Sequence, residues 1–137
     1  MNVEPYLSFE GRCEEALNFY QKVLGAEVTV MMRFSESPEP CDPGMVPPGS
    51  ENKILHATFR IGKATLMASD GGCVGATKFE GISLALTVAD IAAAEKVFAA
   101  LAGGGQVQMP LTKTFFSPSF GMVGDKFGVM WMVVVQP

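Results

Sequence analysis

The sequence predicts an α+β protein made of two copies of one unit, each with the order strand, helix, strand, strand, strand. Three observations predict this fold class. Each half of the chain places a short apolar run before a segment with helical spacing, and a glycine, Gly25 or Gly103, stands just after that segment. Shifting the chain on itself by 78 residues superimposes these glycines. We therefore expect one domain, 1–137, with modules at about 1–72 and 80–137.

The first predicted module contains one helix, at residues 12–24. Ala16 and Tyr20 share its apolar face, and Glu14 and Glu15 stand in the first turn, where carboxylates favour a helix start. Strands are predicted around it from apolar runs and from alternation with period two. They cover residues 3–9, 27–34, 53–61 and 63–69, with a tight turn at Gly62 between the last two.

The second predicted module repeats this order, with a helix at residues 90–102 that Asp90 caps and the glycines 103–105 end. The 78-residue shift aligns Tyr20 with Phe98. Each helix covers one face of a curved, mixed four-stranded sheet, so we expect the two modules together to enclose a cup. The strands are predicted at residues 82–87, 106–113, 120–124 and 128–135.

Two connecting segments have an unusual length or composition. Residues 35–52 form a longer connection than most, and five prolines exclude regular structure there. This segment could serve as a lid, as a dimer arm or as a passive loop. The segment 112–120 holds Phe115 and Phe116, which we expect in the core, over the mouth of the cup or against a partner.

Composition excludes several classes of partner. The net charge is −4 and the ten Lys and Arg residues are scattered, so we expect no binding to nucleic acid. The amino terminus lacks the pattern of a secretory signal, and the longest wholly apolar run, 129–135, is too short to cross a bilayer. Cys13, Cys41 and Cys73 lack the spacing of zinc and redox sites. We expect reduced thiols in a cytoplasmic protein.

A series of short motifs runs in order over nearly the whole chain. Together the motifs resemble the PhnB-like branch of the glyoxalase/bleomycin-resistance superfamily, the vicinal oxygen chelate proteins. The resemblance implies two βαβββ modules and a small homodimer. Some members carry a demethylubiquinone methyltransferase name, but no predicted strand leads through a Gly-x-Gly turn into a helix, so we expect no S-adenosylmethionine site. The motifs are Tyr6-Leu7-Ser8-Phe9-x-Gly11, Ala16-Leu17-x-Phe19-Tyr20, Leu24-Gly25-Ala26-Glu27, Ile54-Leu55-His56-Ala57, Leu66-Met67-Ala68-Ser69-Asp70, Gly104-Gly105-x-Val107 and Asp125-x-Phe127-Gly128-x-x-Trp131.

The resemblance also gives positions for a metal ion. In metal-dependent members, four His or Glu side chains project into the cup, and the shared motifs place them at Pro5, His56, Ser83 and Met132. Only His56 could bind a metal, and it is the single histidine of the chain. We therefore predict no cofactor, with a divalent metal as the disfavoured alternative. The usual basis for glyoxalase, dioxygenase or epimerase chemistry is then missing.

A pocket for an unknown small molecule is predicted around His56. If His56 faces the cup, Thr58 and Arg60 face it too, because side chains two apart on a strand share a face. Neighbouring strands add apolar walls, which makes an ordinary small-molecule pocket. The predicted ligand-binding residues are Phe9, His56, Thr58, Arg60, Ser83 and Met132.

Three functions are compatible with this site. The first is a metal-independent protein that binds or senses a small molecule, with Arg60 holding an anionic group. The second is an enzyme of lyase, isomerase or oxygenase type, with His56 as acid, base or metal ligand. The third is a homodimer without a ligand. A structural, hydrogen-bonded His56 and an Arg60 that ends its strand in solvent are the alternatives for the individual residues.

Three further residues have structural interpretations. Asp70 and Asp125 stand before glycine-containing turns and are predicted as turn residues. Trp131 alternates out of phase with Met130 and Met132, so we expect it to pack beneath a helix.

Overall fold

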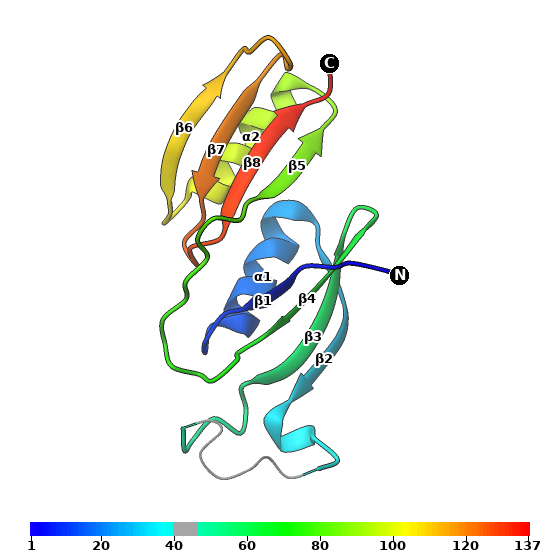
Figure 1. The fold of residues 1–137 in the computed structure, drawn as a ribbon, viewed down its shortest axis with the longest axis vertical. Helices are drawn as coiled ribbons and strands as arrows, with labels where there is room; N and C mark the ends of the chain where they lie inside the picture. Colours follow the sequence, from blue (N-terminus) through cyan, green and yellow to red (C-terminus); the bar gives the residue numbers. More distant parts are fainter. Residues whose placement is uncertain (40–46) are drawn as a thin grey trace. The chain divides into compact units, whose positions relative to one another are not determined.

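The computed structural model describes residues 1–39 and 47–137 and divides the chain into two compact units, Met1–Thr77 and Lys78–Pro137 (Figure 1). We call them module 1 and module 2 and describe each by itself, and the single-domain prediction stays a prediction. Part of the predicted loop, including Cys41, lies outside the described residues. No helix in the described ranges is long and apolar enough to cross a membrane.

Module 1 is a four-stranded mixed sheet with one helix. Its strand order is β1-β4-β3-β2, in which β1 runs parallel to β4 and the other pairs are antiparallel. Gly62 makes the tight turn between β3 and β4, at a φ of 58° that suits glycine. The elements are β1 (Tyr6–Ser8), α1 (Cys13–Leu24), β2 (Glu27–Arg33), the short 3-10 helix η1 (Phe34–Glu36), β3 (Ile54–Ile61) and β4 (Ala64–Ser69).

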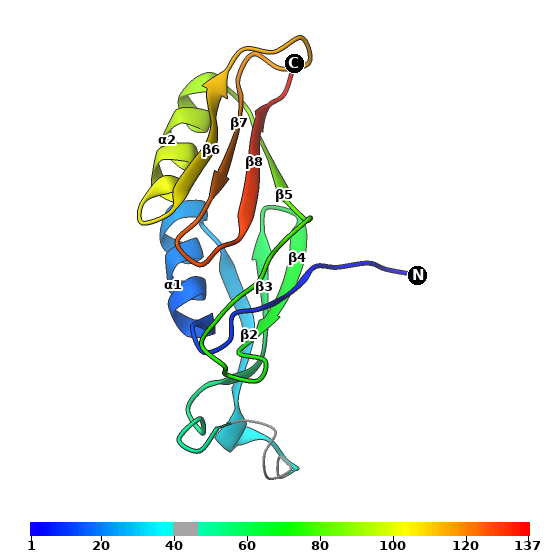
Figure 2. The same cartoon turned by 60° about the vertical axis from the view of Figure 1, so that its left-hand side comes forward.

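Module 2 has the same arrangement, with the strand order β5-β8-β7-β6 and β5 parallel to β8. Figures 1 and 2 show each helix lying along one face of its own sheet. The predicted α+β class and the repeat of the βαβββ unit are therefore confirmed. The elements are β5 (Leu84–Val88), α2 (Ile91–Ala102), β6 (Gln106–Thr112), β7 (Phe120–Gly124) and β8 (Met130–Val135).

The core of module 1 lies between α1 and its sheet. Tyr20 stacks on Phe59 of β3 with ring centroids 6.2 Å apart, and it also contacts Phe9. All three side chains are fully buried. Each stabilises the fold by about 1.5–3 kcal/mol through removal of apolar surface from water.

The core of module 2 is built around Phe98 of α2 and Trp131 of β8. A Cβ added at Gly121 would lie 2.8 Å from the Phe98 ring, so glycine lets the helix approach the sheet closely. Trp131 is 3% exposed, which confirms its predicted place beneath the helix. Its indole N–H donates to Asp125 at 2.9 Å, and the same carboxylate accepts from backbone N–H groups of its own turn.

The two helices begin in different ways. In α2, the Asp90 side chain accepts from the Ala93 N–H at 2.8 Å, the N-cap that its sequence predicts. At the start of α1, the acceptor comes from the end of β4. The buried Asp70 carboxylate accepts from the N–H groups of Gly11, Cys13 and Ile54 at 2.7–2.9 Å. The structure confirms Asp70 as the turn residue that the sequence predicts, since its carbonyl accepts from the Cys73 N–H, and its side chain in addition joins three segments of module 1.

Candidate functional site

The candidate site lies on the face of the first sheet opposite α1, which we call the distal face of module 1. The strand register defines it, because Ala57 and Phe59 pack under α1 and the alternate residues of β3 point the other way. His56, Thr58 and Arg60 therefore share this face, as the sequence predicts. Around them lie Tyr6, Ser8, Val30, Met32, Met67 and Ser69.

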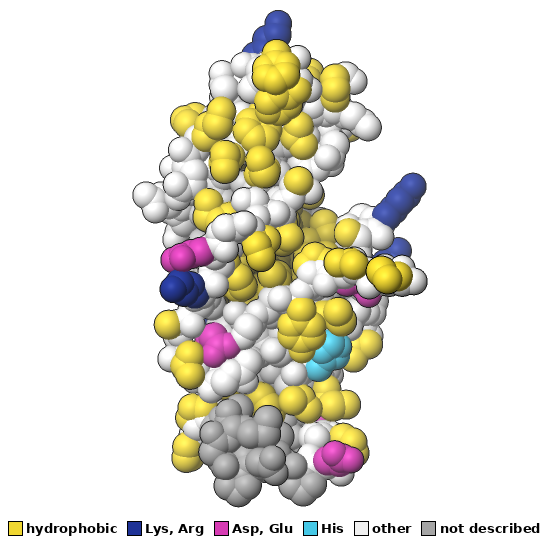
Figure 3. Space-filling model, viewed as in Figure 1, with side chains coloured by type: hydrophobic (Ala, Val, Ile, Leu, Met, Phe, Trp, Pro, Cys, Tyr) yellow, Lys and Arg dark blue, Asp and Glu magenta, His cyan; other side chains and the backbone are white. Residues whose placement is uncertain are grey.

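A chain of three hydrogen-bonded side chains occupies the middle of this face. The Tyr6 hydroxyl lies 3.1 Å from Nδ1 of His56, and Nε2 of His56 lies 3.2 Å from the Thr58 hydroxyl. The Tyr6 and His56 rings are also in contact, with centroids 5.7 Å apart. Figure 3 shows the histidine at the surface of module 1, beside hydrophobic side chains. Both ring nitrogens are thus held, and the imidazole has a fixed orientation.

Arg60 lies further along the same strand. It is exposed and stands opposite Glu27 of β2 in the register. Within the described residues, the ion pairs are Arg12–Glu15 and Arg33–Glu14, and neither includes Arg60. Its guanidinium can therefore meet an anionic group.

Phe9 is the predicted site residue that the structure places elsewhere. Leu7 pairs with Ala68, and Ala68 pairs with Ala57, which packs under α1. The side chain of Leu7 therefore also lies on the face that α1 covers. Phe9 follows with the same alternation and contacts Tyr20 of that helix. Tyr6, and not Phe9, is the aromatic residue of β1 on the distal face. Its position at the start of the strand was the sequence signal that could have identified it.

The remaining predicted residues, Ser83 and Met132, belong to module 2. Met132 lies on the face opposite α2, since Trp131 and Val133 on either side of it are buried. Ser83 directly precedes β5 and is exposed. Hydrophobic side chains gather on this module in Figure 3. Together with Met132, the face opposite α2 carries Met122, Met130, Val134 and Ala85.

The mapped metal positions offer a poor set of donors. Pro5 has no donor side chain, Ser83 and Met132 bring a hydroxyl and a thioether, and His56 already has hydrogen bonds at both nitrogens. Within the described ranges, no three His, Cys, Asp or Glu side chains gather closely enough to hold an ion. These residues do not fit the divalent metal that the family resemblance implies.

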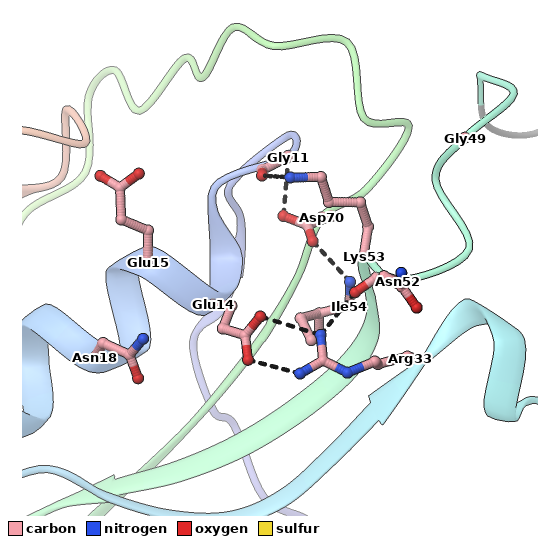
Figure 4. A pocket seen from close by; sticks show the side chains of 10 residues that line it. All are labelled: Gly11, Glu14, Glu15, Asn18, Arg33, Gly49, Asn52, Lys53, Ile54 and Asp70. Atoms are coloured by element: carbon pink, nitrogen blue, oxygen red, sulfur yellow. Dashed lines mark hydrogen bonds and ion pairs between the residues drawn. The ribbon is translucent and has the colours of Figure 1, made fainter.

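Module 1 also has a polar cavity of about 430 Å³, at the start of α1 (Figure 4). Glu14 of α1 binds Arg33 of β2 through both carboxylate oxygens, at 2.6 and 3.0 Å. Lys53 donates to the carbonyl of Gly11 at 2.8 Å. None of the predicted site residues lines this cavity. Its lining residues are Gly11, Glu14, Glu15, Asn18, Arg33, Gly49, Asn52, Lys53, Ile54 and Asp70.

The ionisable groups near this cavity stabilise structure. The hydrogen bond from Arg33, followed by its positive charge, lowers the pKa of Glu14, and Glu14 raises the pKa of Arg33. Burial, then the charges of Asp70 and Glu14, raise the pKa of Cys13 far above its ordinary value. Cys13 therefore stays a thiol at neutral pH and is a poor nucleophile.

The two βαβββ modules define a protein of the glyoxalase/bleomycin-resistance fold. A glyoxalase/bleomycin resistance protein/dioxygenase family enzyme from Burkholderia phytofirmans shows this likeness, with 14% identity and a TM-score of 0.60 over 98% of this chain and 96% of the other. At this level of identity the likeness concerns the fold alone.

Nearer relatives identify the family. The sequence model of the family described as 3-demethylubiquinone-9 3-methyltransferase matches residues 1–134. Protein YjdN of Escherichia coli is 37% identical over 98% of this chain and 95% of YjdN. Protein PA1353 of Pseudomonas aeruginosa is 42% identical with a TM-score of 0.84, over 99% of this chain and 98% of that one. A PhnB protein from Bacillus cereus is 32% identical with a TM-score of 0.79, over 98% and 99%. The chain belongs to this family, the PhnB-like branch of the vicinal oxygen chelate superfamily.

Proposed function

We propose that this protein binds a small molecule on the distal face of module 1 and does so without a metal ion. The hydrogen-bonded chain of Tyr6, His56 and Thr58 carries the proposal. It places three polar groups in the middle of a face that also carries apolar side chains, such as Met32 and Met67. A few oriented polar groups among apolar side chains are typical of a ligand site.

The geometry supports binding more than methyl transfer. A nucleotide-type cofactor is usually held by a glycine-rich turn between a strand and the helix that follows it. The connection from β1 to α1 contains one glycine, Gly11, and the connection from β5 to α2 consists of Ala89 and Asp90. Neither connection resembles that turn, so we do not carry the methyltransferase name of the family to this chain.

A ligand screen tests the proposal. Protein purified without chelator or histidine tag is screened for compounds that raise its melting temperature, beside variants His56→Ala and Thr58→Val. Gln21→Ala, on the exposed surface of α1, is the matched control. We expect compounds that stabilise the wild type and the control but neither site variant. A stoichiometric divalent ion that is lost in His56→Ala would overturn the metal-independent site.

An enzyme of lyase, isomerase or oxygenase type is the second candidate. The Tyr6–His56 hydrogen bond favours it, because an oriented imidazole can transfer a proton to or from a bound molecule. With a compound from the screen, His56→Gln should then abolish turnover and leave binding largely intact. A His56→Gln variant with full turnover would exclude this role.

The assembly and location of the protein are part of the proposal. We propose a homodimer, because β1, β2, β5 and β6 are sheet edges with backbone groups that a partner can cover. We also propose the cytoplasmic location that the sequence predicts. Equilibrium sedimentation at micromolar concentration should give twice the mass of the chain. A monomer at that concentration would exclude the dimer.

A further inference from the structure

We infer that the polar cavity at the start of α1 is a second ligand site, which takes a small zwitterion of the amino-acid type. The carboxylate of this ligand binds at Lys53, and its ammonium group binds at Glu14 and Glu15. The site goes beyond the proposed function, because the hydrogen-bonded residues around His56 do not line this cavity. The inference follows from the arrangement of the charges and from the hydrogen-bonding positions that they still have open.

The cavity has the size of a small-molecule site. Its volume of about 430 Å³ lies within the range that is usual for ligand pockets. Its walls differ from those of an ordinary pocket, because the side chains that line it are polar or charged, with the exception of Ile54. Such walls favour a ligand with charged or hydrogen-bonding groups over an apolar one.

The charges of the cavity come from different segments of module 1 (Figure 4). Glu14 and Glu15 belong to the first turn of α1, whereas Arg33 ends β2 and Lys53 directly precedes β3. Carboxylates therefore line the helix side of the cavity, and cations line the side of the strands. A ligand that reaches from one side to the other meets charges of both signs.

The ion pair of Glu14 and Arg33 leaves acceptor positions open. Each Glu14 oxygen accepts one hydrogen bond from Arg33, at 2.6 and 3.0 Å, whereas an ionised carboxylate has about four acceptor positions. The two parallel hydrogen bonds also fix the orientation of the carboxylate. Its remaining acceptor positions are thus oriented before a ligand arrives, which reduces the entropy that binding costs.

Lys53 offers the opposite kind of group. Within residues 1–39 and 47–137, its ammonium donates one hydrogen bond, to the carbonyl of Gly11 at 2.8 Å, and belongs to neither of the two ion pairs. An ammonium group has three N–H donors, so two remain for a ligand. The bond to Gly11 ties the side chain to the loop before α1 and fixes its direction.

Lys53 and Glu14 lie close enough to share one small ligand. The hydrogen bond from Arg33 is the main cause of the lowered pKa of Glu14, and the charges of Arg33 and Lys53 lower this pKa further. Two charges affect each other in this way when they lie within a Debye length, roughly 10 Å or less. A short amino acid spans such a gap when each of its charged ends makes a hydrogen bond of about 3 Å.

The balance of charge favours a molecule with both signs. Together with Asp70, three carboxylates and two cations line the cavity, and Arg12, which is paired with Glu15, balances the third carboxylate. A lone anion at Lys53 meets these carboxylates, and a lone cation at Glu14 meets the cations. A zwitterion places each of its charges beside the opposite one, so both ends contribute to binding.

Binding of short amino acids to isotope-labelled, full-length protein tests the site by NMR spectroscopy. Glycine, β-alanine and γ-aminobutyrate carry the same two charged groups at increasing separation, whereas sodium acetate and methylammonium chloride carry one each. We expect at least one of the three zwitterions to bind at millimolar concentration and to shift the backbone amide signals of Gly11 and Asn18. Neither single ion should produce these shifts at the same ionic strength.

Two substitutions remove one charge each from the cavity. Lys53→Met keeps the side-chain stem, and Glu15→Gln keeps the shape of an exposed residue of α1. Each should weaken binding of the zwitterion by about tenfold or more, the effect of one charge-assisted hydrogen bond. Lys63→Met and Glu95→Gln, at exposed positions outside the cavity, are the matched controls and should bind as the wild type does. Glu15→Gln decides the test if the loss of the Lys53–Gly11 hydrogen bond unfolds the other variant.

Three results would overturn the inference. In the first, none of the three zwitterions shifts the cavity signals. In the second, acetate or methylammonium shifts them as strongly as a zwitterion does. In the third, the cavity variants bind as tightly as the controls. Thr58→Val, which alters the distal face of module 1, should leave zwitterion binding unchanged, so this site and the proposed function are tested separately.

Discussion

Modules 1 and 2 share a strand order and differ in what secures the start of the helix. The first turn of α2 is capped within the helix itself, by Asp90, three residues before its partner Ala93. The first turn of α1 is secured by Asp70, whose partner Gly11 lies 59 residues away. The same architecture can therefore have its helix start stabilised by a local hydrogen bond in one copy and by a long-range hydrogen bond in the other.

The faces away from the helices differ as well. Module 1 presents Tyr6, His56 and Thr58 there, whereas module 2 presents Met122 and Met132. The scaffold of the repeat is kept while the exposed side chains have diverged. Substitutions made in one module and compared with substitutions in the other test how far the two modules differ.

The largest effect is expected for Asp70→Ala. Three backbone N–H groups of module 1, those of Cys13 and Ile54 in buried hydrogen bonds, would lose their acceptor, and we expect the free energy of unfolding to fall by about 3 kcal/mol or more. Urea unfolding followed by circular dichroism measures this loss. A change no larger than that of Asp90→Ala would contradict the long-range cap.

The next effect is expected for Gly121→Ala, which tests the close approach of α2 to its sheet. The added methyl would meet the Phe98 ring at 2.8 Å, and overpacking of this kind costs about 1–3 kcal/mol. Gly72→Ala in module 1 is the control, because its nearest neighbours would be 3.7 Å away. Equal unfolding midpoints for the two variants would show that α2 can move outward freely.

A smaller effect is expected for Asp90→Ala. Loss of an exposed N-cap acceptor lowers the free energy of unfolding by about 1 kcal/mol. Asp90→Ser should restore most of it, because serine is also a good N-cap residue. Failure of serine to restore stability would point to a role of the Asp90 charge rather than the cap.

The smallest effect is expected for Glu14→Gln, and it depends on pH. Because Arg33 lowers the pKa of Glu14 in the folded protein, the pair stabilises the fold above the ordinary pKa of a glutamate. The contribution is lost as the pH falls through the lowered value. Thermal unfolding should separate variant and wild type modestly at pH 7, and the difference should shrink as the pH falls through the lowered pKa of Glu14. A constant difference across this range would contradict the assignment.

The fold could be predicted from the sequence because its signals are local. Periodicity, Gly25 and Gly103 locate the helices, and alternation locates Trp131 beneath α2. The candidate site was predicted only in part. His56, Thr58 and Arg60 share a face because they follow one another on β3, and that alternation is visible in the sequence.

The error at β1 has a specific physical cause. The 78-residue shift that aligns Tyr20 with Phe98 also places Leu7 on Ala85, yet Leu7 lies under α1 and Ala85 lies opposite α2. The strand is one residue out of phase with the helix, and a slip of one residue exchanges the two faces. Phe9 was therefore predicted for the ligand face, and Tyr6 was missed. Only the pairing of β1 with β4 resolves this.

The long-range cap also bears on the order in which the chain folds. The first turn of α2 is capped as soon as the local hydrogen bond between Asp90 and Ala93 forms. The first turn of α1 is capped only after β3 and β4 have brought Asp70 close to Gly11. Closing so long a loop is slow compared with local contacts. Folding kinetics of the Asp70 and Asp90 variants should show it. Asp90→Ala should slow folding, and Asp70→Ala should mainly speed unfolding.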